Sequence, residues 1–357
     1  MSSLENVIAA ETRLSEVDGL NGRLVICGHS LDALAGRKSF EAVLALLLPD
    51  VLSTSEEAVR AELAQARLRA FREVARLDTD LVSLSVTEAL RALMARLPDG
   101  EDKSVALLQM AAPAVFVPAL VRAKAGRKPI PPHAGRGHAA EMLVMLTGDQ
   151  PDEEHIRALD TYLVTVSDHG LNASTFTARV VASTRAGYAS AVLAALGALK
   201  GPLHGGAPGP VLDMLDAVAT PDNATAWLAG EISRGERLMG FGHRIYRVRD
   251  PRADALKTAL NRLGAAGGMD ANRLALAEAV ERAALAALRA AKPDRVLETN
   301  VEFFTALLLE ALGFPRDAFT GVFAAGRVGG WIAHAHEQIE TGRLIRPQSV
   351  YVGPKVA

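Results

Sequence analysis

The sequence predicts an all-α fold, and three observations support this. Apolar residues recur at helical spacings over long stretches, strand signals are confined to short segments near the two ends, and glycine- or proline-rich loops separate the helical runs. The chain has 357 residues, and a single hydrophobic core stops growing near ~250 to 300 residues. We therefore expect a helical protein of two domains.

The strand signals are GRLVICGH, residues 22–29, read as a short hairpin element, and QSVYVG, residues 348–353. The single cysteine, Cys27, lies in the first of them. It has no partner for an intramolecular disulfide, which is typical of a reducing compartment. We expect a free buried thiol.

Residues 54–77 show a clear helical pattern. Their apolar positions are spaced by four, three, four, four and three, which places one face of a helix on Val59, Leu63, Ala66, Ala70, Val74 and Leu77. Thr54 and Glu57 are spaced as a capping box at its start. Residues 126–137, with prolines among basic residues, predict a loop between helices.

A second helical stripe covers residues 274–292. It is rich in alanine, which permits a neighbouring helix to approach closely, and it consists of Ala277, Val280, Ala284, Leu288 and Ala291. Pro293 is expected to end this helix.

The composition excludes several classes of protein. With 39 basic and 41 acidic residues and 4% aromatics, the chain lacks the basic surface and stacking rings of a nucleic-acid-binding protein. Acidic residues interrupt residues 1–16 before any apolar signal region develops, and no run of about 18 apolar residues appears. We expect a cytoplasmic protein with no nucleic-acid or membrane partner.

Two tempting motifs do not predict their usual ligands. HAHEQ, residues 334–338, lacks the two histidines at i and i+4 that a zinc-binding HExxH helix needs. His334 and Glu337 are therefore expected to be helix-packing residues. AAGRVGG, residues 324–330, has no Walker lysine and is not a P-loop. No metal site is expected.

Three clusters each place one proton-handling side chain in a glycine-rich or short polar setting between apolar helical runs. They are GPLHGG (residues 201–206), MGFGHRIYRVRDPRA (239–253) and LETNVEFF (297–304). The side chains are His204, His243 and Glu302. Two imidazoles and a carboxylate suit the removal of a proton next to a carbonyl.

Together with DHGLNAS (168–174) and EMLVMLTGDQPDEEHIRALDTYL (141–163), these clusters resemble the citrate synthase family. The likeness runs from residue 168 almost to the C-terminus, and residues 1–130 match only in general layout. The resemblance implies a large helical domain, residues 1–205 and 314–357, and an inserted small helical domain, residues 206–313. The active site would lie in the cleft between them.

The resemblance also implies a reaction, the condensation of acetyl-CoA with oxaloacetate and the hydrolysis of citryl-CoA to citrate and CoA. His204 would donate to the thioester oxygen, and Glu302 would take the proton from the adjacent carbon. His243 would donate to the ketone oxygen of oxaloacetate. No tightly bound cofactor is implied, since the coenzyme A thioester is a co-substrate.

Binding residues follow from the same resemblance. His169, Arg252, Arg327 and Arg346 match positions that contact oxaloacetate, whose carboxylates suit planar guanidinium groups. In the family the last arginine reaches across from the other subunit, so a homodimer with shared active sites is implied.

Coenzyme A needs close backbone approach and cations for its phosphates. By the same resemblance we expect Gly240, Phe241 and Gly242 of the MGFGH motif to allow the close backbone approach. The nearby Arg247 would supply a cation for the phosphates.

One departure from the family concerns the base, which is normally aspartate in NVDF or NVDA and is here Glu302. An added methylene moves the carboxylate by roughly 1 Å, which can cost on the order of 100-fold in rate unless the backbone compensates. Two alternatives stay open. One is a 2-methylcitrate synthase that uses propionyl-CoA, and the other is a catalytically weak relative that binds acyl-CoA or a dicarboxylate as a regulator.

Overall fold

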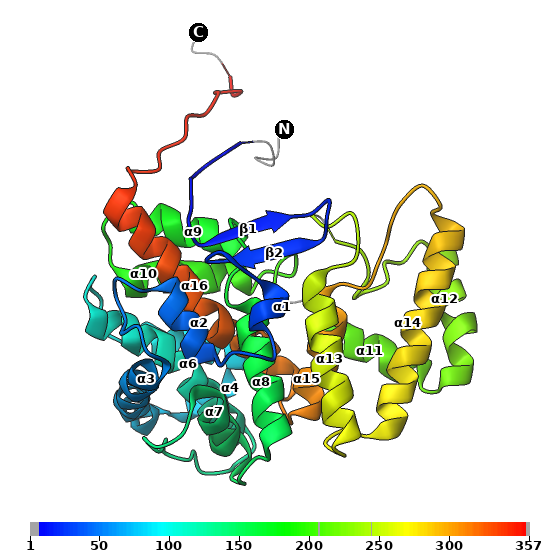
Figure 1. The fold of residues 1–357 in the computed structure, drawn as a ribbon, viewed down its shortest axis with the longest axis horizontal. Helices are drawn as coiled ribbons and strands as arrows, with labels where there is room; N and C mark the ends of the chain where they lie inside the picture. Colours follow the sequence, from blue (N-terminus) through cyan, green and yellow to red (C-terminus); the bar gives the residue numbers. More distant parts are fainter. Residues whose placement is uncertain (1–6, 206–207, 244, 355–357) are drawn as a thin grey trace.

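The computed structural model describes residues 7–205, 208–243 and 245–354, and it confirms the all-α fold (Figure 1). Within these residues the regular sheet is a small three-stranded one, in the order β1-β2-β3. The strands are β1 Ser15–Asp18, β2 Arg23–Ile26 and β3 His29–Ser30. All pairs are antiparallel, and Ser15 faces Ile26 across the first of them.

The two strand predictions differ in outcome. Residues 22–29 form the expected hairpin, in which Cys27 (φ 47°) and Gly28 (φ 81°) make the turn in the left-handed region. The thiol of Cys27 is free, as expected, although the residue is half-buried rather than buried. Residues 348–353 form no strand, so that prediction was wrong, because the segment runs outward with no neighbouring strand among the described residues (Figure 1).

The helices before residue 205 and those after it follow in chain order. The first group is α1 Leu31–Leu34, α2 Phe40–Leu47, α3 Glu56–Phe71, η2 Arg72–Arg76, α4 Thr79–Ser83, α5 Val86–Met94, α6 Lys103–Lys124, α7 His138–Thr147, α8 Glu153–Val166, α9 Ala173–Ala182 and α10 Tyr188–Leu199. The second group is α11 Pro208–Val218, η3 Pro221–Asn223, α12 Ala224–Ser233, α13 Pro251–Ala265, α14 Ala271–Ala291, α15 Val301–Ala311, η4 Arg316–Ala318 and α16 Phe319–Thr341.

Both predicted helices are present with shifted ends. Ser55, not Thr54, caps α3 by accepting a hydrogen bond from the Ala58 N–H, so the predicted capping box was wrong. The chain then tightens into the 3₁₀ helix η2, where the buried stripe ends at Val74. Helix α14 starts after its Asp270 cap and ends two residues before Pro293. Its buried face is the predicted stripe without Ala291, which is exposed.

Helix α6 is a long helix of the core, and most of its residues are buried. It is long and apolar enough to cross a membrane by composition, so the expectation that no segment reaches this length and hydropathy was wrong. Within its most apolar window 94% of the residues are buried inside the protein. Its surroundings are α3, α5, α7, α10 and α16, which pack directly against it. The predicted loop at residues 126–137 connects this helix to α7.

Helices α11, α12 and α14 gather on one side of the molecule (Figure 1). α12 packs on α14, α11 packs on α15, and α13 bridges α15 to α8. The predicted small domain, residues 206–313, takes in all of these helices except α8. Its boundaries stay a prediction, and the first of its residues, Gly206, lies outside the described part of the chain.

Candidate active site

The loop that carries His243 is tied to the start of α15 by backbone hydrogen bonds. The Gly242 N–H donates to the Glu298 carbonyl oxygen at 2.7 Å, and Phe241 forms an isolated bridge with Thr299. These bonds fix the histidine loop beside α15, whose first turn contains Glu302.

Glycine is required at two positions of this loop. Gly240 (φ 86°) and Gly242 (φ 77°) adopt left-handed backbone, and a Cβ on Gly240 would lie 3.0 Å from the Phe303 Cβ. The ring of Phe241 packs on that of Phe303, with 5.3 Å between centroids. Close packing thus accounts for these residues, and their contact with coenzyme A stays a prediction.

The tautomer of His243 follows from its contacts. Its Nδ1 accepts hydrogen bonds from the backbone N–H groups of Ile245 at 3.0 Å and Tyr246 at 3.1 Å, so the neutral ring carries its proton on Nε2. Burial, with Arg252 beside it, lowers the pKa of His243 to about 4. The ring is therefore neutral near pH 7 and donates from Nε2.

Arg252 is held by the residue that starts its helix. Asp250 caps α13 and accepts from the Arg252 Nε at 3.0 Å and Nη2 at 2.8 Å. The same carboxylate accepts from the Val301 N–H at 3.3 Å. One buried aspartate therefore fixes a guanidinium and the first turn of α15 relative to each other.

His169 lies beside this pair. Its Nε2 is 3.0 Å from the Tyr246 hydroxyl, and its ring centroid is 6.0 Å from that of His243. Burial first, and then Arg252 and Arg327, keep the pKa of His169 well below its ordinary value. A second neutral imidazole therefore faces the two arginines.

Arg327, on α16, is almost completely buried. Its Nε donates to the Val166 carbonyl oxygen, and its guanidinium carbon lies 5.0 Å from the centroid of the Phe323 ring. Burial lowers its pKa to about 10, although Asp168 nearby partly offsets this. No carboxylate forms an ion pair with it in the described residues.

Glu302 occupies the first turn of α15 and is partly exposed. Its carboxylate makes no hydrogen bond or ion pair within the described ranges. Burial raises the pKa of Glu302 to about 7, an effect that Arg252 and Arg327 reduce and Asp250 reinforces. A carboxylate with this pKa is suited to accept and release a proton at neutral pH.

His204 is positioned by Ser174. Its Nε2 is 2.8 Å from the Ser174 Oγ, which accepts from the Trp331 Nε1 at 3.1 Å and donates to the Asn172 Oδ1 at 2.8 Å. That amide oxygen already accepts from the Thr175 N–H. Its second lone pair accepts the Ser174 hydroxyl proton, so the Ser174 Oγ is left to accept from the Nε2–H of His204. Burial lowers the pKa of His204 to about 4.

A network of buried polar side chains lies next to the site. The His334 Nδ1 is 2.8 Å from the Arg179 Nη1, a donor, so its Nε2 carries the proton and faces both Asp168 carboxylate oxygens at 3.2 Å. Arg179 also pairs with Glu337 at 2.7 Å. His334 and Glu337 thus have the structural role predicted for them.

The structure brings six of the predicted site residues together and leaves two apart. The cluster consists of His169, His204, His243, Arg252, Glu302 and Arg327. Arg247 is exposed, and only its backbone N–H is bonded, to the Gly19 carbonyl oxygen at 2.8 Å. Arg346 is exposed in the C-terminal segment that leaves the body (Figure 1).

Four residues that hold this cluster were not predicted from the sequence. Asp250 had a signal, because an aspartate followed by proline is typical of a helix start. Ser174 and Trp331 meet across 157 positions, and Tyr246 reaches His169 across 77. Such long-range pairs have no local signature.

Known proteins were then compared with this chain. A family model described as the C-terminal domain of citrate synthase matches residues 3–348. The chain belongs to the citrate synthase family. Solved citrate synthases share the fold: that of Thermotoga maritima is 31% identical with a TM-score of 0.85, and 99% of this chain and 96% of that one are covered. A ternary complex of the Thermoplasma acidophilum citrate synthase with carboxymethyl coenzyme A and oxaloacetate is 29% identical, with a TM-score of 0.86 and coverage of 99% and 96%.

Curated family members include proteins named as citrate synthases and proteins named as 2-methylcitrate synthases. "Putative citrate synthase 2" of Mycobacterium tuberculosis is 51% identical over 205 residues, which are 57% of this chain and 53% of that protein, so the match spans about half of its length. The citrate synthase of Haloferax volcanii is 39% identical, with 99% of this chain and 95% of that protein aligned. The 2-methylcitrate synthase of Mycobacterium tuberculosis is 36% identical, with 98% and 90% aligned.

Proposed function

We propose that this citrate synthase family member condenses acetyl-CoA with oxaloacetate and hydrolyses the citryl-CoA product to citrate and CoA. The observation that carries this proposal is the buried Arg327, which forms no ion pair in the described residues, beside Glu302, whose pKa is about 7. A buried cation without a partner is costly, so an anionic ligand stabilises it. A neighbouring carboxylate of this pKa then supplies the base.

Oxaloacetate fits the cationic side of the cluster. Arg327 binds one carboxylate, and Arg252, whose Nη1 is not used by Asp250, binds the other. The His243 Nε2–H donates to the ketone oxygen and polarises the carbon to be attacked. His169 adds a neutral contact beside them.

The acyl thioester supplies the nucleophile. Glu302 removes a proton from the carbon next to the thioester, while His204 stabilises the developing enolate oxygen. The enolate carbon then bonds to the ketone carbon, while the Nε2–H of His243 donates a hydrogen bond to the developing alkoxide oxygen. That oxygen is protonated with the proton that Glu302 removed, so Glu302 returns to its ionised form and His243 stays neutral. Water hydrolyses the thioester, which releases citrate and the free thiol of CoA.

Acetyl-CoA is the first choice of substrate and propionyl-CoA the second. The second is favoured by the 2-methylcitrate synthase of Mycobacterium tuberculosis, which aligns over 98% of this chain. One methylene in a pocket discriminates by only ~1 to 3 kcal/mol.

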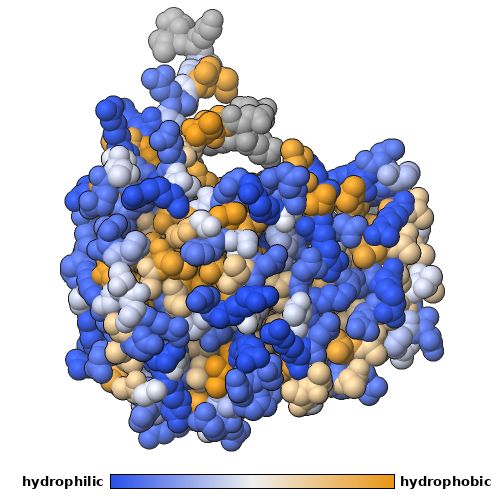
Figure 2. Space-filling model, viewed as in Figure 1, coloured by the Kyte–Doolittle hydropathy of each residue, from blue (hydrophilic) through white to orange (hydrophobic). Residues whose placement is uncertain are grey.

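A cytoplasmic homodimer is part of the proposal. Arg346 lies in a C-terminal segment whose Val350, Tyr351 and Val352 are 86%, 76% and 92% exposed. Figure 2 shows apolar side chains on this projecting segment, above a face that is mostly hydrophilic. A partner subunit would cover these side chains and would receive Arg346 in its own active site.

A thiol-release assay tests the function. Purified protein with oxaloacetate is expected to release CoA from acetyl-CoA faster than from propionyl-CoA. The reverse preference would assign it as a 2-methylcitrate synthase. Binding of both substrates without thiol release would contradict catalysis and would support the regulatory alternative.

A further inference from the structure

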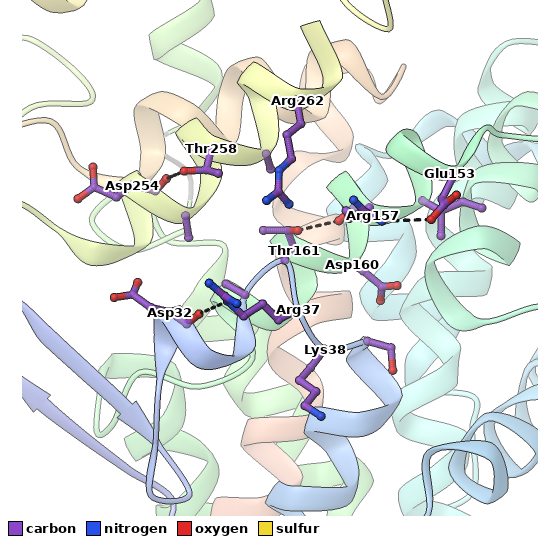
Figure 3. A pocket seen from close by; sticks show the side chains of 16 residues that line it. Asp32, Arg37, Lys38, Glu153, Arg157, Asp160, Thr161, Asp254, Thr258 and Arg262 are labelled. Atoms are coloured by element: carbon purple, nitrogen blue, oxygen red, sulfur yellow. Dashed lines mark hydrogen bonds and ion pairs between the residues drawn. The ribbon is translucent and has the colours of Figure 1, made fainter. Parts of the chain in front are cut away.

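A large surface hollow lies away from the candidate active site. It is a groove of about 740 Å³ between the loop after α1, helix α8 and helix α13 (Figure 3). None of the six clustered site residues lines it. One wall is α13, which begins at the Asp250 cap and contains Arg252 of the candidate active site. The opposite wall is formed by α8 and the loop after α1.

Three cations in the groove have no carboxylate partner among the described residues. They are Arg37, Lys38 and Arg262. The Arg37 Nε donates to the backbone oxygen of Asp32 at 3.0 Å. No hydrogen bond or ion pair of the Lys38 or Arg262 side chain occurs in the described chain.

The cations approach the groove from two sides. Figure 3 shows Arg262 extending from α13 toward Thr161 on α8, while on the loop after α1 Arg37 points toward Asp32 and Lys38 points away from Arg262. A Cβ built on Gly36 would lie 3.7 Å from the Arg262 Nη1 and 3.5 Å from the Thr161 Oγ1. The tip of Arg262 therefore lies against the loop that carries the other two cations.

Most acidic residues of the groove already have partners, one of which, Arg157, also lines the groove. Glu153 pairs with Arg157 at 3.1 Å, and Asp254 pairs with Arg249. Asp160 accepts from the Phe40 N–H at 2.9 Å, and burial raises its pKa to about 7. The Asp32 carboxylate, which is exposed, is the remaining counter-charge. The groove is thus richer in available cations than in available anions.

We infer that this groove binds a compact phosphate-bearing polyanion. The guanidinium groups of Arg37 and Arg262, which come from two elements, suit an anion with oxygens on several sides better than a single planar carboxylate. The lining contains no aromatic residue, so nothing there would stack on a nucleotide base. A bound polyanion would link α13 to α8 and to the loop after α1.

Titration calorimetry with pyrophosphate at constant ionic strength tests this inference. Wild-type protein is expected to bind one pyrophosphate per chain, and Arg262→Gln is expected to weaken binding at least tenfold. Arg282→Gln is the matched control, because it removes the same charge from an exposed position on α14, outside the groove. It should change the affinity less than about twofold, since exposed distant charges are screened.

Thermal unfolding gives a second measurement. Pyrophosphate should raise the Tm of wild-type protein and of Arg282→Gln, and it should leave that of Arg262→Gln unchanged. No saturable binding, or binding that Arg262→Gln leaves intact, would overturn the inference. Equal weakening by both variants would show only a general charge effect, and equal affinity for citrate would contradict the preference for phosphate.

Discussion

His243 and Arg252 direct two hydrogen-bond donors at each other, with the His243 Nε2 and the Arg252 Nη2 3.0 Å apart. The backbone N–H groups of Ile245 and Tyr246 occupy Nδ1, so the ring proton lies on Nε2. A guanidinium has no acceptor. Two donors cannot satisfy one another, so an acceptor oxygen completes the pair, as the ketone oxygen of oxaloacetate would do.

His243→Ala is therefore expected to lower kcat about 100-fold or more, because a positioned donor to a developing charge contributes at least that much. The residue lies in a loop and is only half-buried, so the fold should persist. Thiol release measures the first effect, and the circular dichroism melt checks the second. A folded variant that keeps more than about a tenth of wild-type kcat would remove His243 from this role.

The pH dependence of turnover should report Glu302. Its pKa is about 7 and it must be ionised to act as a base, so kcat/KM should fall about tenfold per pH unit below that value. His204 and His243, with pKa values of about 4, stay neutral throughout this range. A profile of kcat/KM from pH 5.5 to 8.5 is the measurement. A flat profile down to pH 6 would argue against a base of this pKa.

Ionised Glu302 should also destabilise the fold. Its pKa is raised from 4.5 to about 7, so between these values the folded state holds a proton that the unfolded state has lost. Stability therefore falls as pH rises through this window, and Glu302→Gln should be more stable than wild type by roughly 2 to 3 kcal/mol at pH 8. The difference should shrink toward pH 5. Urea unfolding at both pH values measures it.

Glu337→Gln is the matched control for that experiment. The Glu337 carboxylate pairs with the buried Arg179, and its pKa is lowered by the Arg13 N–H and Arg179, although burial opposes this. Its ionised form therefore stabilises the fold. Removing the charge leaves a buried guanidinium without its partner, so this variant should lose roughly 3 to 5 kcal/mol at pH 8. A gain in stability for Glu337→Gln, or a loss for Glu302→Gln, would contradict these assignments.

Arg346 should act in the site of the partner subunit. Subunits with Arg346→Ala and subunits with His204→Ala are each expected to be inactive. Mixed dimers should regain up to one intact site per dimer, because each site draws on both chains. Thiol release after verified subunit exchange is the measurement. Mixed dimers as inactive as both parents would place Arg346 outside a shared site.

The fold class and the centre of the site were predictable because their signals are local. The helical spacing of residues 54–77 and 274–292 predicted two helices, and the glycine-flanked His243 stood out within its own motif. Helix ends were less predictable, since Thr54, Ser55 and Glu56 all suit a helix start and tertiary packing selects among them.

What the sequence did not predict depends on residues far apart in the chain. The hydroxyl group that orients His204 belongs to Ser174 and also accepts a hydrogen bond from Trp331. These three residues lie far apart in the sequence, so no single motif contains them. Likewise, the long apolar sequence of α6 does not by itself show that the helix is a core helix. The helices that pack around it show this. The segment at residues 348–353 has strand-like composition but no strand to pair with among the described residues.

The most direct test of the central claim is CoA release by Glu302→Gln with acetyl-CoA and oxaloacetate at pH 8. At this pH the wild-type carboxylate is mostly ionised, and glutamine keeps its size and removes its basicity. If Glu302 takes the proton from the acyl group, kcat should fall on the order of 100- to 10,000-fold while the affinity for oxaloacetate persists. Unchanged turnover in a folded Glu302→Gln protein would contradict this role and would require another carboxylate of the chain to be the base.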